Sequence, residues 1–177
     1  MLSRMSLGIA GLGRLGSMVA SYGKCFGMKV NFYDPYVTDP LIPGLKRADT
    51  LEELVEDNDI VSIHIPHKPE TEKLFNEEIF SKFKQGSFLI NTSRGELIDF
   101  SVLLRSLQNK VLAGAALDVF EGEYEEGFSK KYITHPLLEY ARKHDNLIIT
   151  PHIGGSTCDA WRLTEEFTLR KVIEALE

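Results

Sequence analysis

The sequence predicts an α/β fold in which helices cover both faces of one doubly wound parallel sheet. Short apolar segments alternate along the chain with stretches of helical periodicity, and helix start signals lie between them. Segments such as Val30–Tyr33 and Val61–Ile65 are apolar on both faces, which is typical of strands buried beneath helices. With 177 residues and about 150 residues per domain, the chain is predicted to form one domain, residues 1–177.

Six short and mainly apolar segments are expected to be strands, and a short seventh is expected near Leu45–Ala48. The six are Leu7–Ala10, Met28–Tyr33, Ile60–Ile65, Ser87–Asn91, Leu112–Leu117 and Leu147–Thr150.

The helices are predicted from their start signals. Thr50 and Glu53 have capping-box spacing, because a Thr hydroxyl can accept from the third amide while the Glu reaches back. Asn76 and Asp99 can each cap a helix, covering about 77–84 and 100–108. Pro136 is expected to open a helix that ends near residue 143.

The last helix is expected to begin at Ser156 or Thr157 and to run to the end of the chain. Its Trp161 has helical spacing with Leu163, Thr164 and Phe167, which favours packing over cofactor stacking. The charged segment 121–131 is expected to be an irregular loop, and His135 and His144 are expected at the surface.

Composition excludes several classes of function. The net charge is −6, with no long block of either sign, so neither nucleic acid nor a membrane surface is an expected partner. The longest uncharged apolar stretch, 111–117, is far shorter than a membrane-spanning helix, which needs about 20 residues. Cys25 and Cys158 are too few for a disulfide framework or a metal site. With no signal peptide in residues 1–10, we expect a cytoplasmic protein without a metal.

A glycine motif follows the first predicted strand. Gly11, Gly13 and Gly16 form G-x-G-x-x-G at the opening of a helix. In such a motif the first glycine makes a tight turn, the second lets a pyrophosphate approach the backbone, and the third allows close helix packing. The helix start at Arg14 and Leu15 would offer free amides to the phosphates. A purely structural glycine-rich turn would give the same letters.

Asp34 favours the ligand-binding interpretation of these glycines. It lies 21 residues after Gly13, at the end of the second predicted strand, where an acid can accept from both ribose hydroxyls. Its carboxylate would repel a 2′-phosphate, and the following Pro35 and Tyr36 offer no cation. The pattern therefore predicts a Rossmann-type domain that binds NAD rather than NADP.

Two further segments place candidate catalytic residues where strands end. Arg94 follows the predicted strand 87–91 and can present a bidentate fork to a carboxylate, although a surface or capping role would suit it equally. His152 lies between Pro151 and a glycine pair after the last strand, where it can serve as a proton donor.

These motifs together resemble the D-isomer-specific 2-hydroxyacid dehydrogenases, a family that includes phosphoglycerate-type enzymes. The matching segments run in order over nearly the whole chain: Leu7–Gly16, Tyr33–Pro35, His64–Pro66, Pro69–Thr71, Ile90–Gly95, Gly114–Phe120 and Thr150–Thr157.

The resemblance implies roles for individual residues. Arg94 would bind the substrate carboxylate and carbonyl, and His152 would give or take the hydroxyl proton. Asp118 would meet the nicotinamide carboxamide, and Thr92 would contact the cofactor. The acid that hydrogen-bonds the histidine lies five residues after the Asp in the family, which is Glu123 here.

The segment around Glu123 departs from the family pattern. The family usually has Pro after this Glu, whereas Tyr124 follows here, and Glu121, Glu125 and Glu126 crowd the segment. A shift in register would give the role to Glu121.

The resemblance implies hydride transfer between NADH and a 2-oxo acid, and a homodimer. In the family the cofactor domain is inserted into a substrate domain, and only six residues precede the first predicted strand here. We therefore expect that this chain lacks the substrate domain, either as a fragment of a longer enzyme or as a naturally short chain. Which 2-hydroxy acid it serves stays open.

Two other functions are consistent with the glycine loop. One is a non-catalytic module that binds or senses NAD. The other is a methyltransferase that binds S-adenosylmethionine, which would leave Arg94, Glu123 and His152 without a purpose.

Overall fold

Seven parallel strands form one sheet in the computed structural model, which describes residues 1–176 and all their side chains except those of Ser129 and Lys131. The sheet order is β3-β2-β1-β4-β5-β6-β7. The strands are β1 (Ser6–Ala10), β2 (Lys29–Tyr33), β3 (Lys46–Arg47), β4 (Ile60–Ile63), β5 (Ser87–Asn91), β6 (Leu112–Leu117) and β7 (Leu147–Ile149). The predicted doubly wound sheet is confirmed, including its short seventh strand. The predicted domain ends at Glu177, which lies outside the described residues.

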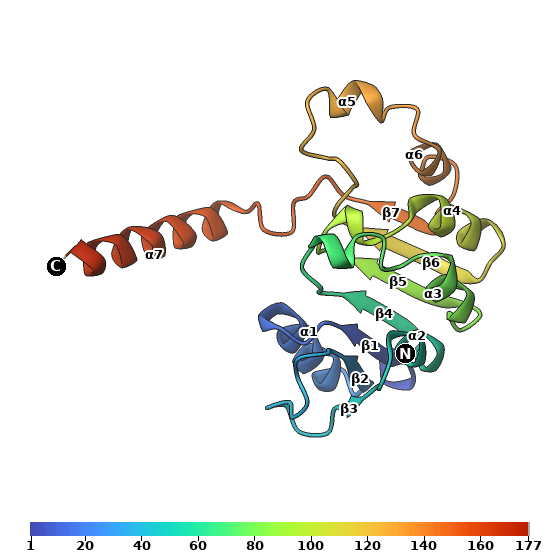
Figure 1. Cartoon of the computed structure of the whole chain (residues 1–177), viewed down its shortest axis with the longest axis horizontal. Coiled ribbons are helices and arrows are strands. Elements are labelled where there is room, and N and C mark those ends of the chain that lie inside the picture. The colour runs from blue at the N-terminus through green and yellow to red at the C-terminus, as the bar shows by residue number, and fades with distance from the viewer. Residues whose placement is uncertain (177) are drawn as a thin grey trace.

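Helices pack on both faces of this sheet (Figure 1). The α-helices of the described chain are α1 (Arg14–Cys25), α2 (Leu51–Asp57), α3 (Glu77–Lys82), α4 (Phe100–Gln108), α5 (Phe128–Lys131), α6 (Pro136–Ala141) and α7 (Cys158–Leu176), of which α7 does not pack on the sheet. The step from β1 to β2 runs opposite to the steps from β4 to β7, so right-handed crossovers place α1 on one face and α3, α4 and α6 on the other. Because the direction reverses between β1 and β4, the sheet has a switch point beside β1, where such sheets bind ligands.

Two apolar clusters hold the layers together. The larger cluster lies between the sheet and helices α2, α3, α4 and α6, and includes the fully buried Leu54, Leu89 and Leu103. The smaller cluster lies under α1, where a Cβ added to Gly23 would come 2.7 Å from a methyl carbon of Leu7. A larger residue at this position would force the Leu7 side chain to shift, so glycine lets α1 pack closely against β1.

The predicted N-caps at Thr50, Asn76 and Asp99 are confirmed, but Glu53 accepts from Asp49 N at 2.8 Å instead of completing the capping box at Thr50 N. The Thr50 hydroxyl accepts from Glu53 N at 3.1 Å, and Asn76 and Asp99 each accept from two amides of the following helix. The helix after Asn76 ends two residues earlier than predicted. It ends because Phe83 turns to an extended backbone (ψ 135°) and packs its buried ring on Phe80.

Two predictions about the segment after β6 are wrong. Residues 121–131 are not irregular throughout, because Gly127 (φ 79°) starts the short helix α5 and Phe128 packs against Phe120. His135 is half-buried rather than at the surface: its ring lies 5.0 Å from that of Phe120, and its Nδ1 accepts from Leu137 N. Burial lowers the pKa of His135.

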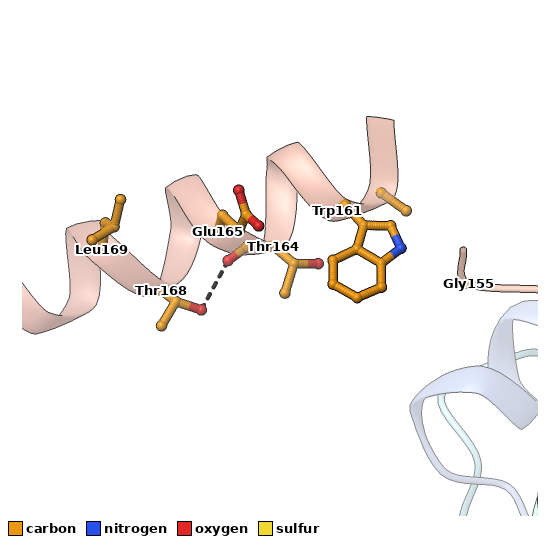
Figure 2. Close-up of a pocket in the computed structure, with 7 residues that line it drawn as sticks. Gly155, Trp161, Thr164, Glu165, Thr168 and Leu169 are labelled. Atoms are coloured by element: carbon orange, nitrogen blue, oxygen red, sulfur yellow. Dashed lines mark hydrogen bonds between the residues drawn. The ribbon is translucent and has the colours of Figure 1, made fainter. Parts of the chain in front are cut away.

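Helix α7 projects away from the sheet and has no buried residue (Figure 1). Thr157 caps it, since its hydroxyl accepts from Ala160 N at 3.1 Å. Trp161 is 62% exposed and Phe167 61%, so the predicted packing of this face is wrong within the described chain. Figure 2 shows Trp161, Thr164 and Leu169 along an open hollow beside Gly155. Residues 1–176 contain no helix with the length and apolar character needed to cross a membrane.

Candidate active site

The predicted site residues meet at one edge of the sheet. Because all strands are parallel, their carboxyl ends share that edge, and each site loop leaves from it. The glycine loop follows β1, Arg94 follows β5, Asp118 follows β6 and His152 follows β7.

A different physical constraint explains why each of the three positions in the loop is a glycine. Gly11 has a φ of 93°, a conformation that other residues rarely adopt. A Cβ on Gly16 would lie 2.0 Å from the carbonyl oxygen of Gly11, so Gly16 is required by packing. A Cβ on Gly13 would meet nothing within 4 Å, so no protein contact explains this glycine.

The open space at Gly13 fits a phosphate group. Gly13, Arg14 and Leu15 are exposed, and no side chain caps the start of α1. Uncapped amides and the helix dipole attract an anion at this point. The observed loop therefore has the room and the donors that a dinucleotide pyrophosphate requires.

The Asp34 carboxylate anchors this loop. Its Oδ2 accepts from Leu12 N at 2.8 Å, and its Oδ1 accepts from Tyr36 N at 2.8 Å and Val37 N at 3.2 Å. The residue is 8% exposed, and its carboxylate can accept further bonds, since a carboxylate has about four acceptor positions. The Arg47 guanidinium on β3 donates to the Asp34 carbonyl oxygen at 3.4 Å. The sequence did not predict this cation near Asp34.

A cavity of about 430 Å³ lies beside the glycine loop and Asp34. Its walls include Gly11, Tyr33, Pro35, Tyr36, Ile65 and Pro66. His64 lies next to this wall, with its Nε2 2.9 Å from the Ser62 hydroxyl, and burial lowers its pKa. The mainly apolar walls suit a flat heterocycle such as adenine.

Asn91 shapes the loop that carries Arg94. Its buried side chain donates to the Arg94 carbonyl oxygen at 2.8 Å and accepts from Ser93 N at 2.9 Å. A Cβ on Gly95 would lie 2.2 Å from Glu121 N, so the Arg94 loop lies directly against the segment after β6. The Arg94 guanidinium is exposed and donates to the Ser93 carbonyl oxygen, while Thr92 is exposed beside it.

Glu123 and His152 form a close pair. Glu123 Oε1 lies 2.6 Å from His152 Nδ1, and Glu123 Oε2 accepts from Phe120 N at 3.1 Å. The Glu123 side chain is 12% exposed and that of His152 is 33% exposed. Because a carboxylate only accepts, Nδ1 carries the proton and Nε2 is the nitrogen available for a reacting group. Glu121, the alternative partner, instead lies 3.9 Å from Lys73 Nζ.

Asp118 holds the loop on both sides of His152. Its Oδ1 accepts from the Thr150 hydroxyl at 2.5 Å and from Ile153 N at 3.0 Å, and its Oδ2 accepts from Gly154 N at 2.8 Å. Between these anchors His152 has a φ of 52°, a strained conformation for a residue with a side chain. Burial raises the pKa of Asp118, but the bonds from Thr150, Gly154 and Ile153 and the nearby His152 outweigh it and lower the pKa.

Tyr124 was missed by the sequence reasoning as a partner of this pair. Its hydroxyl oxygen lies 3.2 Å from His152 Nδ1, the same nitrogen that meets Glu123. Asn91 was also missed, although an Asn at a strand end before Ser is a local signal for such a turn. Among residues 1–176, no three His, Cys, Asp or Glu side chains gather as metal ligands would.

The fold and these loops define a dinucleotide-binding domain with a carboxylate–histidine pair at its ligand-binding edge. Residues 1–154 match the model of the D-isomer specific 2-hydroxyacid dehydrogenase family, NAD binding domain. The chain therefore belongs to this family, and it is an α/β domain that binds NAD.

Individual relatives support the same family. The chain is 42% identical over 156 residues to D-3-phosphoglycerate dehydrogenase of Bacillus subtilis, covering 88% of this chain and 28% of that protein. It is 37% identical to glyoxylate reductase of Thermofilum pendens, covering 99% of this chain and 50% of the relative. The structure of D-lactate dehydrogenase from Aquifex aeolicus, complexed with NAD and lactic acid, superposes with a TM-score of 0.86 at 38% identity, covering 99% of this chain and 54% of that chain. The chain thus spans about half the length of the last two proteins, and less of the first.

Proposed function

We propose that this chain is the cofactor-binding part of an NAD-dependent enzyme that interconverts a 2-oxo acid and a D-2-hydroxy acid. The observation that carries the proposal is the 2.6 Å contact between Glu123 Oε1 and His152 Nδ1 at the edge where the glycine loop also lies. A histidine oriented by a carboxylate is a general acid or base whose other nitrogen faces the reaction.

Each site residue has a role in this proposal. Arg94 binds the substrate carboxylate through its guanidinium fork and polarises the carbonyl group. His152 Nε2 donates a proton to the carbonyl oxygen during reduction, and Glu123 stabilises the positive imidazole before the proton leaves.

The cofactor would lie along the edge of the sheet. Its pyrophosphate would meet the amides at Gly13, Arg14 and Leu15, and its adenosine would lie in the cavity beside Asp34. Asp118 and Thr92 would contact the nicotinamide end. When bound, NADH supplies the hydride, while the protein supplies position and charge.

The substrate is proposed only as a class. The relatives are named for 3-phosphoglycerate, glyoxylate and lactate, all of them 2-hydroxy or 2-oxo acids. The shared part of these molecules is the carboxylate with its neighbouring oxygen, which is what Arg94 and His152 would recognise. We propose that a second domain, corresponding to the unmatched half of the relatives, supplies the opposite wall and selects the side chain.

We further propose a homodimer in a cytoplasmic compartment. Both cysteines are exposed and free, which suits a reducing environment. Phe88 and Ile148 leave apolar surface exposed on the sheet, with 39% and 60% of their area accessible. Sedimentation velocity would give the mass of the assembly.

A hybrid enzyme tests the proposed catalysis. The hybrid carries this chain in place of the matching half of Thermofilum pendens glyoxylate reductase. The alignment with that protein covers 99% of this chain. We expect NADH-dependent reduction of glyoxylate, and His152→Gln should lower kcat by about 10²-fold or more, because general acid catalysis contributes 10²–10⁴-fold. His144→Gln, at an exposed histidine, is the matched control and should leave kcat unchanged.

The same experiment separates the alternatives. Equal kcat in the His152→Gln and unaltered hybrids would contradict the role of His152. A hybrid that binds NADH tightly but reduces no 2-oxo acid would favour a non-catalytic NAD-binding module.

A further inference from the structure

The nitrogen of His152 that meets Glu123 has a second neighbour, which family resemblance does not assign. The Tyr124 hydroxyl oxygen lies 3.2 Å from His152 Nδ1, while Glu123 Oε1 lies 2.6 Å from the same atom. The Tyr124 and His152 rings are tilted by 56°, with their centres 5.9 Å apart. Both partners therefore approach the nitrogen that faces away from the reaction.

Packing into the core does not explain Tyr124. The residue is 76% exposed, whereas Phe120 and Leu137, which are also in this part of the chain, are at most 5% exposed. An exposed aromatic ring gains little from burial. The contact with His152 is thus the feature that distinguishes Tyr124 from an ordinary surface tyrosine.

The turn that carries Tyr124 is fixed at both ends. Gly122 has a φ of 68°, its N donates to Glu96 Oε1 at 3.2 Å, and its carbonyl oxygen accepts from Glu125 N at 2.9 Å. A Cβ on Gly122 would come 2.7 Å from the Tyr132 hydroxyl oxygen, so the turn needs glycine there. This turn brings the side chains of Glu123 and Tyr124 to the same atom of His152.

We propose that Tyr124 is a positioning residue for His152, and this inference rests on the proposed role of His152. The Nδ1 proton is donated mainly to Glu123, and the Tyr124 hydroxyl oxygen accepts a share of the same proton in a three-centre bond. The tilted tyrosine ring also lies beside the imidazole, with the ring centres 5.9 Å apart. Together these contacts hold the imidazole so that Nε2 faces the substrate.

Nuclear magnetic resonance of the histidine rings in this chain tests the proposal without requiring turnover. The chain has five histidines, and the signals of His152 are those lost in His152→Gln. The measured quantity is the exchange rate with water of the proton on His152 Nδ1. Tyr124→Phe removes only the hydroxyl, and Tyr22→Phe at the 56% exposed Tyr22 is the matched control.

We expect Tyr124→Phe to speed this exchange about threefold or more, because a hydrogen bond of net ~0.7 kcal/mol corresponds to that ratio. Tyr124→Leu, which also removes the ring, should speed it further, and Tyr22→Phe should change nothing. Equal exchange rates in Tyr124→Phe and Tyr22→Phe would overturn the proposal.

Glu123→Gln separates this inference from the proposed function. If Glu123→Gln changes the exchange rate of the His152 Nδ1 proton and Tyr124→Phe does not, the carboxylate–histidine pair stands and the role of Tyr124 is wrong. If neither substitution changes this exchange rate, the pair itself is wrong, and so is the proposed proton transfer.

Discussion

The sheet region and helix α7 contain similar apolar residues but place them differently. In the sheet region, Leu89 and Leu103 are fully buried between strands and helices. In α7, Leu169 is 63% exposed and Ile173 is 56% exposed. The sheet region thus completes its own core, whereas the apolar side chains of α7 gain nothing from burial within residues 1–176.

His152 lies where these two regions join, in the loop between β7 and α7. Its position depends on contacts from the sheet side, through Asp118, Glu123 and Tyr124. Under the proposed function, the sheet region alone binds the cofactor. The proposed catalysis also needs the second domain that we propose as the opposite wall of the site.

The largest effect should come from replacing a leucine by alanine, and we compare this substitution in the sheet region and in α7. Leu103→Ala should lower the free energy of unfolding by about 2–5 kcal/mol, since it opens a cavity in the core. Leu169→Ala, at an exposed position of α7, should change it by less than about 0.5 kcal/mol. Urea denaturation of both variants measures this difference, and a loss of more than 2 kcal/mol from Leu169→Ala would show that α7 packs on the domain.

A second prediction distinguishes packing glycines from ligand glycines. Gly16→Ala should destabilise the fold by about 1–3 kcal/mol, because the new Cβ would collide with the Gly11 carbonyl oxygen. In Gly13→Val the new Cβ meets no protein atom within 4 Å, so the free energy of unfolding should change by less than about 1 kcal/mol. Its NADH dissociation constant should rise about tenfold or more, because the new side chain fills the phosphate space.

Thermal melting and an NADH titration on the same two variants check this contrast. Unchanged NADH affinity in a folded Gly13→Val variant would mean that the pyrophosphate does not lie at Gly13.

The loop of His152 should show a pH-dependent stability. The pKa of Asp118 is lowered in the folded chain, so its contribution is fully present above the unfolded value of 3.8 and is lost as the pH falls through the lower, folded pKa. Asp118→Asn should cost about 1–3 kcal/mol at pH 7, since an amide cannot accept from all three donors. This cost should shrink below pH 4. Asp39→Asn, at an exposed aspartate, is the control, and denaturation from pH 2.5 to 7 is the measurement.

The smallest effect concerns cofactor choice. NADH should bind at least about tenfold more tightly than NADPH, a difference of about 1.4 kcal/mol, because the Asp34 carboxylate repels a 2′-phosphate. Asp34→Ala should bring the two affinities within about threefold, with Arg47 beside the strand end available to the phosphate. Calorimetric titration with both nucleotides tests this, and equal affinities in the unaltered chain would contradict the role of Asp34.

Local signals allowed most of the fold to be predicted from the sequence. Helix caps such as Thr50, Asn76 and Asp99 act within three residues, and the glycine spacing encodes a turn that forms locally. The contacts that the sequence did not predict join segments that lie far apart along the chain. Arg47 reaches Asp34 through the pairing of β3 with β2, and Tyr124 reaches His152 across 28 residues.

The wrong predictions have a related cause. Helical spacing indicated an apolar face around Trp161, but within residues 1–176 no surface covers this face. His135 is half-buried because the chain folds back over Phe120, which a position before Pro136 does not reveal.

The division between binding and catalysis can be measured on the 177-residue chain itself. One sample is titrated with NADH, and a second is assayed by nicotinamide absorbance with glyoxylate, pyruvate, hydroxypyruvate and 3-phosphohydroxypyruvate. We expect saturable NADH binding without measurable reduction of any of these acids, because lost positioning removes up to about 7–11 kcal/mol of barrier lowering. Turnover above about 1 per second, in the ordinary enzyme range, would contradict this expectation and show that this chain closes its own active site.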